Sequence, residues 1–138
     1  ALQLFNRAQE DPEAYLLLSE IAEENGKFDD ALLWVNRGLQ KKPEHEGLLL
    51  KKASILMDDF EDIDEAFTIL SLMHMKCKDR PISVLKQELG VEVLLDIYLL
   101  LTDCFRLRSD YQQALKCALK SKEVAPFDER AHLALATA

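Results

Sequence analysis

The chain has 138 residues, enough for one domain, and its hydrophobic content of 49% supports a packed core. The formal net charge of -8 argues against binding to nucleic acid or to an anionic membrane, because both need a basic surface. The three cysteines, Cys77, Cys104 and Cys117, show no paired or metal-binding spacing, which favours a reducing compartment, and we expect a cytoplasmic protein.

The first ten residues carry small or apolar side chains at helical spacing. Ala1, Phe5 and Ala8 fall on one face of a helix. We expect residues 1–10 to be the second helix of an incomplete repeat. Both chain ends are then either cut from a longer array or capped in an atypical way.

Residues 12–43 predict two short amphipathic helices joined by a tight turn. Pro12 suits the first turn of a helix, and Asn25 and Gly26 end that helix because both accept a left-handed backbone. The second helix begins at Phe28 and ends before Pro43. Neither helix can bury its apolar face alone, so we expect the two to pack as antiparallel neighbours.

This stretch resembles the tetratricopeptide repeat, a helical hairpin of about 34 residues. Ala22, where an aromatic residue is usual, and Val35 depart from the family pattern. The small residues Ala31 and Gly38 predict a close approach of the two helices. An unrelated helical bundle is the alternative interpretation. Counted from Pro12, the matching positions are Tyr15, Leu18, Ser19, Ala22, Gly26, Phe28, Ala31, Val35, Gly38 and Pro43.

The first repeat covers residues 12–45. Two further hairpins follow the same pattern, over residues 47–80 and 95–128. The surplus between them, residues 81–94, is interpreted as an extra helix or as an N-terminal extension of the next helix. Residues 129–138 begin another repeat. The resemblance implies an all-α fold, a right-handed α-solenoid of antiparallel hairpins with about seven or eight helices in one domain over residues 1–138.

No reactive constellation is recognisable. His45, His74 and His132 belong to no known catalytic or phosphate-binding motif. His74 and Cys77 are three residues apart on one helical face, but two ligands do not make a metal site. We therefore expect no enzyme activity, no cofactor and no metal.

The resemblance implies that function lies on the first-helix faces, which line a concave groove in this family. Acidic and apolar side chains there would suit a basic or amphipathic peptide or helix. A merely solvated helix face is the alternative, since acidic residues dominate the whole chain. The candidate partner-binding residues are Glu13, Leu16, Glu20, Glu23, Lys51, Ile55, Asp96, Leu99, Asp103 and Arg106.

The leading hypothesis is a non-catalytic interaction scaffold or adaptor. A regulatory or substrate-docking region of a larger enzyme is one alternative. An oligomerisation module is another, because Val91–Leu101 is apolar on nearly every side. Some family members clamp the carboxylate of a chaperone tail with basic first-helix residues. Here the matching first-repeat positions are Glu and Leu, so we expect no such binding. Whether the segment 81–94 divides the groove in two stays open.

Overall fold

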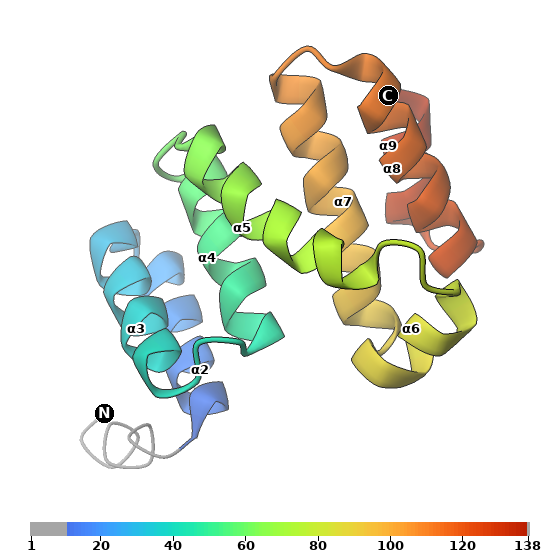
Figure 1. Cartoon of the computed structure of the whole chain (residues 1–138). Coiled ribbons are helices and arrows are strands. Elements are labelled where there is room, and N and C mark those ends of the chain that lie inside the picture. Colours follow the sequence, from blue (N-terminus) through green and yellow to red (C-terminus); the bar gives the residue numbers. More distant parts are fainter. Residues whose placement is uncertain (1–10, 138) are drawn as a thin grey trace. The chain divides into compact units, whose positions relative to one another are not determined.

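A computed structural model describes residues 11–137, which form eight helices and no strands (Figure 1). The prediction of an all-α fold is confirmed for this part of the chain. The predicted partial repeat over residues 1–10 lies outside the described residues. The chain divides into two compact units, Ala1–Asp62 and Ile63–Ala138, and the boundary falls inside the predicted repeat 47–80.

The first unit contains α2 (Pro12–Glu24), α3 (Phe28–Lys41) and α4 (Glu46–Asp58). The carboxylate of Asp11 caps α2 by accepting a hydrogen bond from the backbone N–H of Glu13 at 3.0 Å. Nδ1 of His45 caps α4 in the same way, by accepting from the N–H of Leu48 at 3.2 Å. The predicted helix boundaries are therefore close to those found.

In this unit, α3 packs on α2 and also on α4. Gly38 makes this packing possible, because a Cβ at that position would lie 3.0 Å from Cβ of Tyr15 on α2 and 2.8 Å from Cδ1 of Leu48 on α4. The small residue thus acts as predicted and lets α3 approach two helices at once. The buried core consists of Ala14, Tyr15, Ala22, Ala31, Val35, Leu48 and Ile55.

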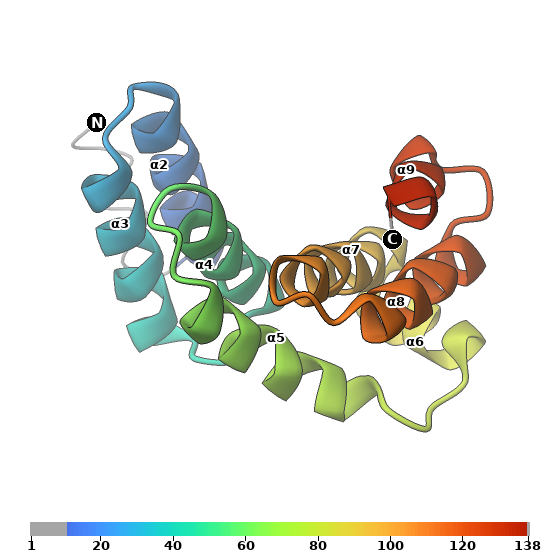
Figure 2. The same cartoon turned by 90° about the horizontal axis from the view of Figure 1, so that it is seen from above.

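The second unit contains α5 (Ile63–Cys77), α6 (Ile82–Leu89), α7 (Val91–Leu107), α8 (Tyr111–Val124) and α9 (Glu129–Thr137). Helix α7 is its centre, since α5, α6, α8 and α9 all pack against it (Figure 2). This position explains why the run Val91–Leu101 is apolar on nearly every side. Leu94, Leu95, Ile97 and Leu101 are each at most 1% exposed, so these side chains serve the packing of the chain itself.

Within the surplus segment 81–94, Ile82–Leu89 form an extra helix, α6, which is the first alternative, and residues 91–94 extend the next helix, which is the second. Gly90 ends α6 with a φ of 86° and donates its N–H to the carbonyl of Lys86 at 3.0 Å. Only glycine adopts such a backbone without strain, so the helix cannot run on into α7. One boundary changes: α7 begins at Val91, and its first turn therefore belongs to the predicted surplus rather than to the repeat 95–128.

Helix length and hydropathy together rule out a membrane crossing by any of the helices within residues 11–137.

Candidate functional site

The predicted acidic face of α2 is present, but two of its three carboxylates are already paired with cationic or polar groups of the same unit. Oε1 of Glu13 lies 3.2 Å from Nε2 of His45, the capping residue of α4. Glu23 forms an ion pair with Lys51 of α4. Glu20 is exposed and forms no ion pair within the described residues, and Leu16 is half-buried against the core. Of the three predicted acids of α2, Glu20 is therefore the one that forms no ion pair within the described residues.

The ion pair between Glu23 and Lys51 has a third member, Asp59, which follows α4. Burial raises the pKa of the Asp59 carboxyl, and repulsion by Glu23 raises it further, whereas Lys51 lowers it. The charge of Lys51 therefore acts on Asp59 as well as on Glu23, with which Lys51 is paired. Its side chain is only 22% exposed, so it has little surface left for a partner.

Ile55 does not belong to a binding face. It is completely buried, and it packs in the core of the first unit with Val35 and Leu48. The prediction placed it on an open face because it occupies the same repeat position as Glu20. The structure corrects this, because α4 turns that side toward α2 and α3.

The predicted residues on α7 divide into a local pair and a wider network. Nη2 of Arg106 donates to Oδ1 of Asp103 at 3.0 Å, one turn away on the same helix. Leu99, which lies between Asp96 and Asp103 in the sequence, is half-buried. Asp96 instead contacts Arg130, a residue of α9 that was not predicted to take part.

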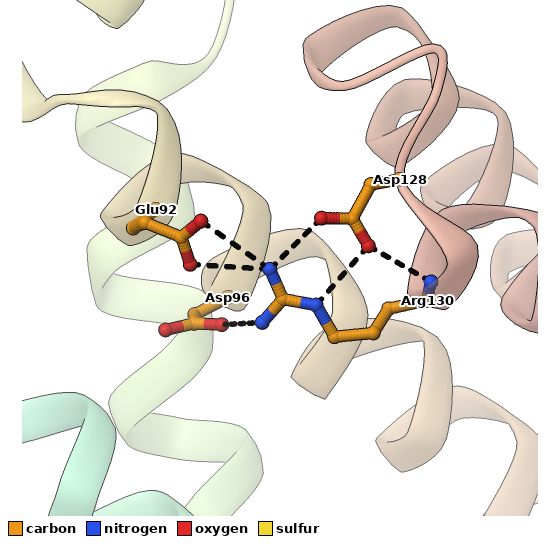
Figure 3. A network of polar contacts seen from close by, with 4 residues as sticks. All are labelled: Glu92, Asp96, Asp128 and Arg130. Carbon is orange, nitrogen blue, oxygen red and sulfur yellow. Dashed lines mark hydrogen bonds and ion pairs between the residues drawn. The ribbon is translucent and has the colours of Figure 1, made fainter.

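Arg130 is the centre of a network of three carboxylates (Figure 3). Its Nη2 lies 3.1 Å from Oε2 of Glu92 and 3.0 Å from Oδ2 of Asp128, and its Nη1 lies 3.6 Å from Oδ1 of Asp96. Its Nε donates to Oδ1 of Asp128 at 3.1 Å. Glu92 and Asp96 are one turn apart on α7, so one guanidinium bridges α7 and the start of α9.

The three carboxylates of this network are not equivalent. Hydrogen bonds from the side chain and backbone of Arg130 lower the pKa of Asp128. Burial raises the pKa of Asp96, and the nearby charge of Arg130 offsets only part of that increase. The pKa of Arg130 itself is raised, mainly by its hydrogen bonds to Asp128 and Glu92. Arg130 is therefore a permanent cation held chiefly by Asp128 and Glu92, with Asp96 as a weaker partner.

Sequence reasoning found the acids of these faces and named Lys51 and Arg106 as binding residues, but it did not predict that these cations pair with the acids, and it missed His45 and Arg130. A signal for Arg130 was available, because it follows Asp96 by about 34 residues, the period that the resemblance to tetratricopeptide repeats predicts. Residues at the same position of successive repeats lie side by side in a helical array. Opposite charges at that spacing predict an ion pair. No comparable signal marks His45 or Lys51.

Two pockets were also missed. One, of about 470 Å³, lies in the first unit and is lined by three aspartates and two phenylalanines, among them Phe28, Asp59 and Phe60. The other, of about 500 Å³, lies in the second unit, where residues from α5, the start of α6, α7 and α8 surround it. The residues that line each pocket come from segments far apart in sequence, so no local motif predicts these pockets.

Metal or thiol chemistry has no support among the residues described. No group of three or more His, Cys, Asp or Glu side chains within residues 11–137 is placed to hold a metal ion. His74, one of the two residues with metal-like spacing, packs edge-on against the ring of Tyr98 at 5.6 Å between centroids. Burial raises the pKa of Cys104 and of Cys117 to about 11, which keeps both as unreactive thiols near neutral pH.

Comparison with known proteins adds no relative. No family model matches the sequence, and no curated protein matches it. The resemblance to tetratricopeptide repeats therefore rests on the pattern of residues quoted above.

Proposed function

We propose that the chain is a non-catalytic interaction module that binds a basic or amphipathic helical segment of a partner protein on the acidic face of α2. We further propose that its hairpins form a right-handed solenoid like that of tetratricopeptide repeats. We also propose that the protein functions in the cytoplasm. The proposal assigns Glu20, an exposed acid of this face, a direct role in binding.

The observation that carries the proposal is the contact of Arg130, a residue of α9, with two acids of α7. Two carboxylates one turn apart on a first helix, Glu92 and Asp96, share one guanidinium from the neighbouring helix α9. The second unit thus holds, within one chain, an example of an arginine from one helix held by two acids on the face of a neighbouring helix. The side-chain chemistry of α2 is similar, with Glu20 and Glu24 one turn apart and both exposed.

A partner of this kind would find apolar contact on α2 as well. Leu17 and Ile21 are 46% and 42% exposed and lie one turn apart beside these acids. An arginine or lysine on the partner would reach Glu20 or Glu24, while an apolar residue covers Leu17 or Ile21. Opposite charge gives such a complex its orientation and association rate, and the apolar contact gives it lifetime.

The test uses the full chain and a synthetic amphipathic helical peptide with arginine on one face and leucine on the other. Fluorescence anisotropy gives the affinity for this peptide and for a matched peptide with glutamine in place of arginine. Glu20→Lys should weaken binding of the arginine peptide by about tenfold, since attraction becomes repulsion. Its melting temperature should stay close to that of the wild type, because Glu20 is exposed and forms no ion pair within residues 11–137.

Asp30→Lys is the control, because it makes the same charge change at an exposed position on α3. An equal loss of affinity in both variants would show that the effect comes only from the change in the net charge of the protein. Equal affinity of the arginine and glutamine peptides, or no effect of Glu20→Lys, would contradict the assignment.

A further inference from the structure

The pocket of the second unit is lined by none of the predicted acidic binding residues, and cations predominate among its charged lining residues. Its lining includes His74 and Cys77 at the end of α5, Tyr98 of α7 and Cys117 of α8. A volume of about 500 Å³ is within the range of pockets that bind a specific ligand or side chain. It is half-open, so an extended segment could enter it without rearrangement of the helices.

Cations outnumber acids around this pocket, in a chain whose net charge is -8. Arg80 is engaged by Glu88, and Lys120 lies 3.7 Å from Glu123. Lys78 and Lys116 form no ion pair within the described part of the chain. Two ammonium groups are thus available at the rim of a cavity, one from each side.

The lysine charges also act on His74, a residue that lines the pocket. The pKa of His74 is lowered by burial first, and then by the charges of Lys78 and Lys120. The imidazole is therefore uncharged at neutral pH, and it senses ammonium groups from both α8 and the loop after α5. An anion placed between those groups would be attracted by the same field.

The lining of the pocket also includes aromatic and apolar side chains. Tyr98 is 4% exposed, and burial raises the pKa of its phenol to about 12, so it stays neutral. The half-buried side chain of Ile82 and the exposed side chain of Leu119 complete an apolar wall. Helix α6 begins at Ile82 without a side-chain cap, which leaves backbone N–H donors at this edge.

We propose that this pocket binds an acidic segment of a partner protein, with carboxylates on Lys78 and Lys116 and a flanking apolar side chain against Tyr98 and Ile82. The site would give the module a second docking surface with a preference opposite to that of α2. The inserted helix α6 then has a functional consequence, because its start forms part of the wall.

Carboxylates suit this site better than phosphates or a nucleic-acid strand. The free cations are lysines, which act as separate point charges, whereas the arginine that could grip a phosphate with two parallel hydrogen bonds is already held by Glu88. A nucleic-acid strand would extend beyond the pocket over a predominantly acidic protein. A short acidic segment with one apolar residue fits both the limited volume and the mixed lining.

The experiment titrates the full chain with a short synthetic peptide in which glutamates flank a leucine. A peptide with glutamine in place of glutamate and a solution of inorganic phosphate are the reference ligands. The glutamate peptide should bind at least tenfold more tightly than the glutamine peptide, and raising the salt concentration should weaken it. The double variant Lys78→Glu/Lys116→Glu should lose this preference.

Lys122→Glu is the matched control, because Lys122 is an exposed lysine of α8 that does not line the pocket. It should bind the glutamate peptide within about twofold of the wild type. Equal binding of the two peptides, equal effects of the pocket and control variants, or a stronger response to phosphate would each overturn the proposal.

Two site-specific measurements accompany the titration. Binding of the glutamate peptide should raise the pKa of His74, measured by NMR, because a bound anion favours the imidazolium form. The same peptide should slow the alkylation of Cys117, which lines the pocket, and leave that of Cys104 unchanged. A bound peptide that changes neither residue binds elsewhere and contradicts the assignment of the site.

Discussion

A Cβ atom added to Gly38 would lie only 2.8 Å from Cδ1 of Leu48, a side chain with no exposed surface. Helix α3 therefore approaches α4 so closely that a methyl group at position 38 would force a neighbouring side chain to shift. Real Cβ contacts are essentially never this short, so something must move when the glycine is replaced. This single approach links the repeat-like pattern of small residues to the packing of the first unit.

Gly38→Ala should lower the stability of the protein. Alanine favours the helix over glycine by about 1 kcal/mol, but overpacking of a dense core costs about 1–3 kcal/mol. Both neighbours, Leu48 and Tyr15, are buried, so we expect the overpacking cost to lie in the upper part of this range, at about 2–3 kcal/mol. The net loss in the free energy of unfolding should therefore be about 1–2 kcal/mol, measured by denaturant titration. Gln40→Ala on the exposed side of the same helix should change it by at most about 0.5 kcal/mol.

A double variant identifies the clash as the cause. Leu48→Val shortens the side chain that the new methyl group would meet, and on its own it leaves a small cavity. Combined with Gly38→Ala, it should cost less than the sum of the two single changes. Additive costs, or a Gly38→Ala protein as stable as the wild type, would show that the contact between position 38 and Leu48 does not determine the stability of the variant.

The two aspartates that contact Arg130 should respond differently to neutralisation. The folded-state pKa of Asp128 is lowered, so its charge adds stability above the pKa of the unfolded chain, and this is lost as pH falls through the folded-state pKa. The folded-state pKa of Asp96 is raised, so its contribution is present below the unfolded-state pKa and is lost as pH rises through the folded-state pKa. At neutral pH, the first charge therefore stabilises the fold and the second opposes it.

Asp128→Asn should accordingly lower the melting temperature at neutral pH, and the difference from the wild type should shrink in acid. Asparagine caps a helix as well as aspartate does, so the change removes the charge and keeps the cap. Asp96→Asn should leave the melting temperature unchanged or raise it. Thermal unfolding of both variants at neutral and acidic pH tests this, and equal losses in the two variants would be the contrary result.

The three cysteines should react slowly and in a defined order. All three are buried, and burial raises their pKa values, so little thiolate is present near neutral pH. Cys77 and Cys117 line the pocket, whereas Cys104 has no exposed surface. Alkylation followed by peptide mass mapping should show Cys104 modified last in the folded protein. In denaturant all three should react at similar rates, and early labelling of Cys104 under native conditions would contradict this packing.

Local sequence signals predicted the helix ends well, because each depends on residues within one turn. Asp11 and Pro12 begin α2, and Gly90 ends α6 through a backbone that other residues avoid. The same reasoning began the third hairpin at residue 95 and left open whether the segment before it extends the following helix, which α7 does by starting at Val91. The repeat pattern begins at residue 95, but nothing after Gly90 prevents the helix from starting at Val91.

The binding faces were harder to predict, because a helical face read from sequence contains no information about its neighbours. Ile55 seemed open by analogy with Glu20, yet it is in the core. The acids seemed available, yet His45, Lys51 and Arg130 engage Glu13, Glu23 and Asp96. These partners come from other helices, so they are distant in sequence and carry no shared motif.

The sequence by itself determined that the chain is helical, where its helices break, and which small residues allow close packing. Those properties follow from backbone preferences and from the period of apolar side chains, which act over a few residues. Only the tertiary structure decided which charges are neutralised and where the pockets lie. A free cation such as Lys116 and a paired one such as Arg130 look alike in sequence, and only the groups brought within a few ångströms by folding distinguish them.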